Sequence, residues 1–207
     1  MRWNSEYNRD QLQSFRIIER TCRRMPDSDR ENLSRAIQPY LHFRTRLAEF
    51  QALTFVPHCR ATCYDTALSA CCGFESIFTF FADQVITMIE SSPADMESVF
   101  RVLSRPNETR NCVYLGENGC LWKVPPVSCA MFLCDGIRKE ILEPRPEAAQ
   151  TWNQFREEEK EYTHPVRPVL FDSVESLFIR LGADSPHMYF HKSPGLLRLK
   201  EKWTLKT

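Results

Sequence analysis

The sequence predicts a mainly helical protein with a single domain, residues 1–207, in which helices surround an irregular, cysteine-rich centre. Three observations support this fold class. Apolar residues recur at three- and four-residue steps in the flanks, 1–58 and 135–207, which is the period of one helix face. Eight of the nine cysteines lie within 59–134. Between residues 107 and 135 the helical period gives way to cysteine, glycine and proline, which is typical of loops.

Two helical segments are expected in the N-terminal flank. The apolar residues of 8–25 fall on one helix face, and this face places Cys22 in the core. A second apolar stripe covers 28–47, and Ser28, with a glutamate three residues later, has the pattern of a capping box at its start. Pro39 lies inside this stripe, so we expect one kinked helix or a broken pair.

The middle of the chain predicts two further helices before the irregular region. The stretch 78–89 places its large apolar residues on one face. Ser92 is followed by a proline, the arrangement of a helix cap and a first helical position, and this next helix would run to about Ser104.

Helices return in the C-terminal flank. Residues 147–162 are highly charged and predict a helix with a solvated face. Residues 172–181 predict a short helix that Asp172 caps and Gly182 ends. The basic tail, 186–207, is expected to be a solvated surface.

Charge and hydropathy exclude several classes of partner. The 27 basic residues balance 27 acidic ones, so no net field attracts nucleic acid or anionic lipid. The N-terminus lacks the apolar segment of a secretory signal. The most apolar stretch, 77–89, is interrupted by Asp83 and Gln84 and is shorter than the roughly 20 residues that cross a bilayer. We therefore expect a cytoplasmic protein without a membrane span. A redox or other protein partner fits these properties, and the oligomeric state is left open.

The clustered cysteines are the main functional signal. They form two groups in the sequence: Cys59, Cys63, Cys71 and Cys72, then Cys112, Cys120, Cys129 and Cys134. In a reducing cytoplasm such clusters bind metal more often than they form disulfides. Thiolates are soft ligands that suit zinc and iron–sulfur clusters, and four is the usual number for both. We expect all eight as metal ligands, in two sites or in one shared site. Buried thiols that act as small hydrophobes, and disulfides, are the alternatives.

The adjacent pair Cys71 and Cys72 constrains the arrangement of ligands. Neighbouring side chains diverge, so the two thiols seldom chelate one metal ion without strain. If both are ligands, they indicate two nearby centres or one polynuclear cluster.

The second cysteine group carries a resemblance to a known family. Cys120 and Trp122 follow a short glycine turn, and a proline step at Pro126 leads to Cys129 and Cys134. This order resembles the bacterial CxxCxxCC family of zinc- or iron-chelating proteins, also called YkgJ-like cysteine cluster proteins. The vicinal cysteines and the helix after them are similar to the same family's double cysteine. In this chain Pro125 replaces the family's usual arginine, and seven residues separate Cys63 from Cys71.

The resemblance implies a metal centre and leaves the activity open. The leading expectation is an iron–sulfur cluster of the 4Fe–4S type with a role in electron transfer or redox sensing. The alternatives are a structural zinc or interaction protein and a cluster-dependent enzyme. A protein methylase is one such enzyme, because flagellin lysine-N-methylase carries a related motif.

Catalytic signatures are otherwise lacking in the sequence. The chain contains no G-x-G-x-x-G, Walker loop, H-E-x-x-H or G-x-S-x-G motif. The run from Cys59 to Cys63 is similar to the start of the radical-SAM triad, but Thr66 stands where the third cysteine should be. His58 could serve as a ligand, although an ordinary surface histidine is the favoured interpretation. At an open coordination position, the nearest candidate bases are His58, Asp65 and Glu75.

Overall fold

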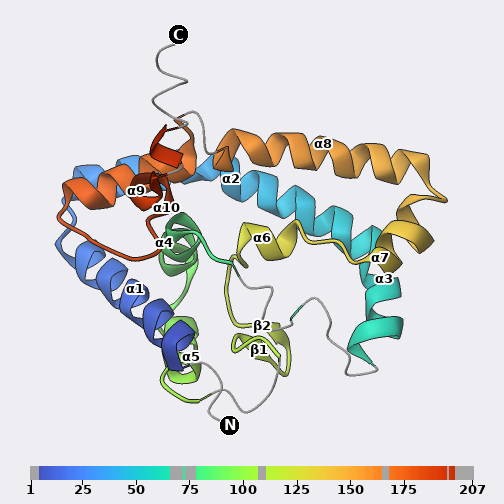
Figure 1. Ribbon diagram of the computed structural model, residues 1–207, viewed down its shortest axis with the longest axis horizontal. Helices are drawn as coiled ribbons and strands as arrows, with labels where there is room; N and C mark the ends of the chain where they lie inside the picture. The colour runs from blue at the N-terminus through green and yellow to red at the C-terminus, as the bar shows by residue number, and fades with distance from the viewer. Residues whose placement is uncertain are drawn as a thin grey trace.

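The computed structural model describes residues 5–65, 72, 78–106, 111–164, 168–194 and 196–198, and within them helices predominate (Figure 1). The strands among these residues are β1 (Leu115–Gly116) and β2 (Gly119–Cys120). The helices, including the two π-helical turns η1 and η4, are α1 (Ser5–Arg24), α2 (Asp27–Thr54), α3 (Val56–Cys59), η1 (Arg60–Tyr64), α4 (Phe81–Glu90), α5 (Pro93–Leu103), α6 (Val127–Ala130), α7 (Asp135–Ile137), η4 (Arg138–Leu142), α8 (Pro146–Thr163), α9 (Leu170–Arg180) and α10 (Tyr189–Lys192). The mainly helical fold class is confirmed.

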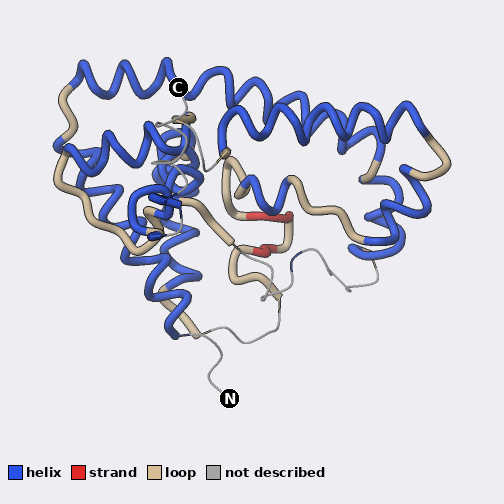
Figure 2. The backbone as a smooth tube through the Cα atoms, turned by 45° about the horizontal axis from the view of Figure 1, so that its top comes forward, coloured by secondary structure: helices blue, strands red, loops and turns tan. Residues whose placement is uncertain are grey.

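The long helices form a frame around the short hairpin of β1 and β2. Helix α4 packs against α1 and α9, and α8 packs against α2 and α9. Helices α2 and α8 lie side by side along one edge of the molecule (Figure 1). The hairpin lies between α5 on one side and α3 and α7 on the other (Figure 2). The hairpin, which ends at Cys120, therefore lies between two helical regions.

Helices α2, α4, α8 and α9 contribute most of the apolar side chains of the main core. Tyr40 is fully buried and meets Phe171 edge to face, with ring centroids 5.4 Å apart. Phe43 contacts Phe155 on α8 in the same layer. This packing explains why α2 continues through Pro39 as one helix. A proline inside a helix costs about 3 kcal/mol, and the buried aromatic stripe on both sides of Pro39 offsets that cost.

Two expected N-caps are wrong. Helix α2 begins at Asp27, after Pro26, and has no side-chain cap, so Ser28 lies inside its first turn. Proline fixes its own backbone in an extended conformation, and acidic residues in the first turn favour the helix dipole. Helix α9 begins at Leu170, which places Asp172 in its first turn rather than at the cap.

Other boundaries agree with the expectations from sequence. Ser92 caps α5, because its hydroxyl accepts a hydrogen bond from the Asp95 backbone nitrogen at 3.2 Å. Gly182 ends α9 with φ of +79°. Helix α4 begins at Phe81, three residues later than the predicted stretch 78–89.

Two apolar side chains near the start of the basic tail are buried, whereas Lys192 and Arg198 are exposed, as expected of a solvated surface. Met188 and Phe190 are both 0% exposed and belong to the main core. Their burial anchors α10 against α9. Cys22 is partly buried and packs against the same core. None of the helices in the described part of the chain combines the length and apolar character that crossing a bilayer requires.

Candidate metal centre

The hairpin of β1 and β2 brings two cysteine-bearing segments together. The strands are antiparallel, and Leu115 pairs with Cys120 while Gly116 pairs with Gly119. Gly119 has φ of +106°, a conformation that residues with a side chain rarely adopt. This tight turn places Cys120 opposite the strand that follows Cys112.

The sulfur atoms of this hairpin accept backbone hydrogen bonds. The Tyr114 backbone nitrogen donates to Cys112 Sγ at 3.4 Å. The Trp122 backbone nitrogen donates to the Cys120 sulfur, and this bond opposes the rise in the pKa of the thiol that burial causes. In both cases the donor lies two residues after the cysteine. Such hydrogen bonds stabilise thiolate charge and tune metal centres that thiolates bind.

Aromatic side chains fix the hairpin to α1. Tyr114 and Trp122 are both buried and meet edge to face, with ring centroids 5.2 Å apart. Phe15 of α1 contacts Trp122 at 5.3 Å. The Tyr114 hydroxyl donates to Gln11 Oε1 at 3.0 Å, so its polar end is also held. These contacts form the smaller core beneath the cysteines.

Helix α4 holds the segment that follows the hairpin. Asp83 Oδ1 accepts from the Val127 backbone nitrogen, and Thr87 Oγ1 accepts from Val124, each at 3.1 Å. Asp83 is buried, and burial raises the pKa of its carboxyl group to about 6 against the opposing effect of Arg44. These bonds position α6, which carries Cys129.

Cys72 completes a group of four neighbouring thiols. Its carbonyl oxygen accepts from the Cys112 backbone nitrogen at 2.6 Å. Burial, followed by the negative charges of Cys120, Cys72 and Cys129, raises the pKa of Cys112 to about 12. The pKa of Cys120 rises to about 11, through burial first and then through Cys129 and Cys72. Cys72, Cys112, Cys120 and Cys129 therefore lie close enough to repel one another when ionised, and we call them the first cysteine set.

Three other cysteines form a second set: Cys59, Cys63 and Cys134. Cys59 and Cys63 are four residues apart on the continuous turns of α3 and η1, so they lie on one face. Burial, and then the charges of Cys134 and Cys63, raise the pKa of Cys59. Cys134 precedes α7, and its sulfur accepts from the Ile137 backbone nitrogen at 3.5 Å.

Cys72 also lies next to the second set. Burial raises the pKa of its thiol, and the charge of Cys63 raises it further. Cys72, a member of the first set, therefore also interacts electrostatically with Cys63 of the second set. Cys71, its neighbour in sequence, lies outside the described residues, as does Glu75.

His58 lies beside the second set. A side-chain carbon at Gly136 would lie 3.7 Å from both His58 Nε2 and Cys134 Sγ, so these two atoms border the same small space. On the other side of the ring, His58 Nδ1 lies 3.7 Å from Glu140 Oε2. The histidine side chain is only 18% exposed. In metal sites, the imidazole nitrogen that does not bind the metal often donates to a carboxylate, and Glu140 lies on that side of His58.

The fold regroups the cysteines relative to their order in the sequence. Cys72 joins the later cysteines, and Cys134 joins the earlier ones. Among the described residues, no disulfide joins two cysteines, and no three His, Cys, Asp or Glu side chains stand at metal-binding distance as they lie. The eight-ligand assignment stays a prediction.

The sequence reasoning missed the residues that support the cysteines. In the sequence, Asp83 and Gln84 appear only as interruptions of an apolar stretch, and nothing marks Arg44. Polar residues in the middle of an apolar helix were the available signal, because buried polar groups are almost always paired.

The chain matches no protein-family model, no curated protein and no solved structure in the comparisons made with each. The resemblance to YkgJ-like proteins therefore rests on the cysteine motifs alone.

Proposed function

We propose that this protein binds iron–sulfur clusters of the 4Fe–4S type through its two cysteine sets and transfers electrons. The observation that carries the proposal is the convergence of Cys72, Cys112, Cys120 and Cys129 from three separate segments of the chain. Four thiolates are the usual ligand set of such a cluster, and the cluster would supply one-electron redox chemistry.

The surroundings of the first cysteine set support a bound metal. Cys72, Cys112 and Cys129 are partly buried, and Cys120 is exposed. A cation would stabilise thiols that repel one another when ionised, because it offsets their charge. The backbone nitrogens of Tyr114 and Trp122 donate to two of the sulfurs. Hydrogen bonds of this kind set the reduction potential of a cluster. In this proposal Cys72, Cys112, Cys120 and Cys129 hold the first centre.

The second centre would use Cys59, Cys63 and Cys134. Its fourth ligand is either Cys71, which lies outside the described residues, or His58, which faces Cys134 across Gly136. Because Cys72 is coupled to both sets, the two centres would be neighbours. Neighbouring centres suit a protein that passes electrons to a redox partner.

A structural zinc protein is the second candidate. The region 111–134 contains only two strands of two residues and the short helix α6 among its described elements. A structural metal contributes folding free energy to such irregular regions. His58 beside the Glu140 carboxylate also suits zinc, for which histidine and cysteine are common ligands.

Serine variants of one cysteine from each set test the proposal. We expect Cys129→Ser to lose the metal of the first centre and Cys134→Ser to lose that of the second, with the other centre retained in each case. Serine is a poor replacement because its hydroxyl stays protonated at neutral pH. Iron, zinc and acid-labile sulfide per chain, measured on protein purified without oxygen, are the readouts.

Cys22→Ser is the matched control, since Cys22 packs against the main core and belongs to neither set. It should keep the full metal content. Unchanged metal in both test variants would rule out the cysteines as ligands. Loss of all metal in each test variant would indicate one shared centre instead of two.

A further inference from the structure

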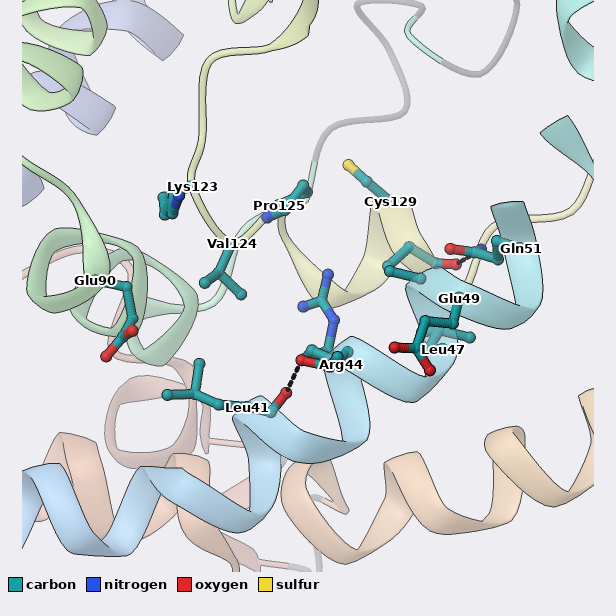
Figure 3. Close-up of a pocket in the computed structure, with 13 residues that line it drawn as sticks. Leu41, Arg44, Leu47, Glu49, Gln51, Glu90, Lys123, Val124, Pro125 and Cys129 are labelled. Atoms are coloured by element: carbon teal, nitrogen blue, oxygen red, sulfur yellow. Dashed lines mark hydrogen bonds between the residues drawn. The ribbon is translucent and has the colours of Figure 1, made fainter. Parts of the chain in front are cut away.

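A cavity of about 550 Å³ lies between α2, the end of α4 and the segment before α6 (Figure 3). This volume is in the usual range for small-molecule sites. Most of its wall is apolar, formed by Leu41, Leu47, Ala48, Val124, Pro125 and Ala130. Gln51 closes one side, because its Nε2 donates to the Ala130 carbonyl oxygen at 2.7 Å and joins α2 to α6. The cavity therefore favours a ligand with a hydrocarbon body.

The guanidinium of Arg44 projects into this cavity. It extends from α2 toward Pro125 and Cys129 (Figure 3). Arg44 Nη1 donates to the Tyr40 hydroxyl at 2.8 Å. Within the described part of the chain Arg44 forms no ion pair with a carboxylate. The Tyr40 hydroxyl in turn donates to Asp83 Oδ1 at 3.4 Å, and the charge of Arg44 opposes the rise in the pKa of that buried carboxyl group. The guanidinium has further donors for an anion.

The charges at the rim limit the charge of the ligand. Glu49 and Glu90 line the cavity on two sides, and Lys123 lies near Val124 at its edge (Figure 3). Arg44 and Lys123 only balance the two carboxylates, so the cavity has no excess positive charge for a dianion such as phosphate, which would also find few polar groups along the apolar wall. A single carboxylate matches the one guanidinium, which can hold it with two parallel hydrogen bonds.

We propose that this cavity binds a small monocarboxylate with an apolar body, whose carboxylate pairs with Arg44. Cys129 forms part of the wall, so the carboxylate would lie beside the first cysteine set. An effect of the ligand on the metal centre rests on the proposed function. Binding itself depends only on the cavity and Arg44.

Octanoate and 1-octanol form a matched pair of probes, since they share a chain length and differ in charge. Isothermal titration calorimetry on the full chain should give saturable binding of octanoate and weaker binding of 1-octanol. Arg44→Met removes the charge and keeps the length of the side chain, and it should weaken octanoate binding by about tenfold or more. Arg46→Met is the control, because Arg46 pairs with Glu158 and does not line the cavity.

Ala48→Phe gives a second test that leaves Arg44 intact. Ala48 lies in the cavity wall and is exposed, so a phenyl group there should occupy the ligand's space and abolish octanoate binding. The inference is overturned by equal octanoate affinity in the original chain, Arg44→Met and Ala48→Phe, by the absence of saturable binding, or by displacement of octanoate with inorganic phosphate.

Metal content separates this inference from the proposed function. Octanoate should bind both metal-free and as-purified protein if the cavity assignment is right. In protein that carries a cluster, octanoate should also shift the visible absorption, because the ligand lies next to Cys129. If the protein as purified contains no metal and still binds octanoate, the cavity assignment is supported and only the proposed function is contradicted.

Discussion

Buried polar side chains on α4 hold the cysteine-rich segment against the helical frame. Asp83 and Thr87 accept hydrogen bonds from backbone nitrogens of that segment, and Gln84 Nε2 donates to Gln11 Oε1 at 2.7 Å. Burying such groups without partners costs free energy, so their pairing explains why an otherwise apolar helix contains them. The sequence shows that polar residues interrupt the apolar stretch 77–89. It does not show their hydrogen-bond partners, which lie far away along the chain.

His187 predicts a pH dependence of stability. Burial lowers the pKa of this histidine below its ordinary value of 6.5. Below pH 6.5 the unfolded chain therefore takes up a proton that the native protein resists, and the free energy of unfolding falls. Between about pH 7 and about pH 5, where histidines titrate, His187→Gln should lose less stability than the original chain.

Urea unfolding at the two pH values, on proteins of equal metal content, measures this effect. His42→Gln is the control, because His42 is exposed on α2. It should follow the original chain. The same pH dependence in all three proteins would contradict the assignment to His187.

At the scale of elements, the short hairpin sets the position of two proposed ligands. Gly119 and Gly182 both have positive φ, and a side-chain carbon at either position would meet nothing within 4 Å. Replacing either by alanine should cost about 1–2 kcal/mol of stability through backbone strain alone. Only Gly119→Ala should also change the first centre, because Gly119 adjoins Cys120 and turns the hairpin.

Thermal unfolding together with metal content separates the two effects. Gly182→Ala, at the end of α9, should lower the melting temperature and keep its full metal content. Gly119→Ala should lower both. If the two variants retain metal equally, the hairpin turn does not position a ligand.

The existence of the long helices was the most predictable feature of the fold. The expected helices at 8–25, 92–104 and 147–162 all appear, as α1, α5 and α8, with boundaries that differ by a few residues. Local signals were less reliable where tertiary packing opposed them. Pro39 does not divide α2, because Tyr40 and Phe43 are buried on the same continuous helix.

At the scale of the whole molecule, two apolar clusters pack against several of the cysteines. The main core joins α2, α4, α8 and α9, and the smaller one joins α1 and α5 to the hairpin. This arrangement could be predicted in outline, since helical stripes at both ends enclosed an irregular cysteine-rich region. The partition of the cysteines could not be predicted. It depends on the packing that brings Cys72 to Cys112 and Cys134 to Cys59, across segments that sequence spacing does not relate.

The most direct test of the metal-centre account is the metal content of the unaltered chain after purification without oxygen. Iron, zinc and acid-labile sulfide per chain would be measured together with the visible absorption before and after reduction. We predict iron with matching sulfide and a brown absorption that weakens on reduction. Zinc without sulfide or colour would contradict the iron–sulfur assignment in favour of the structural zinc protein. A folded chain with neither metal would contradict the metal-centre account itself.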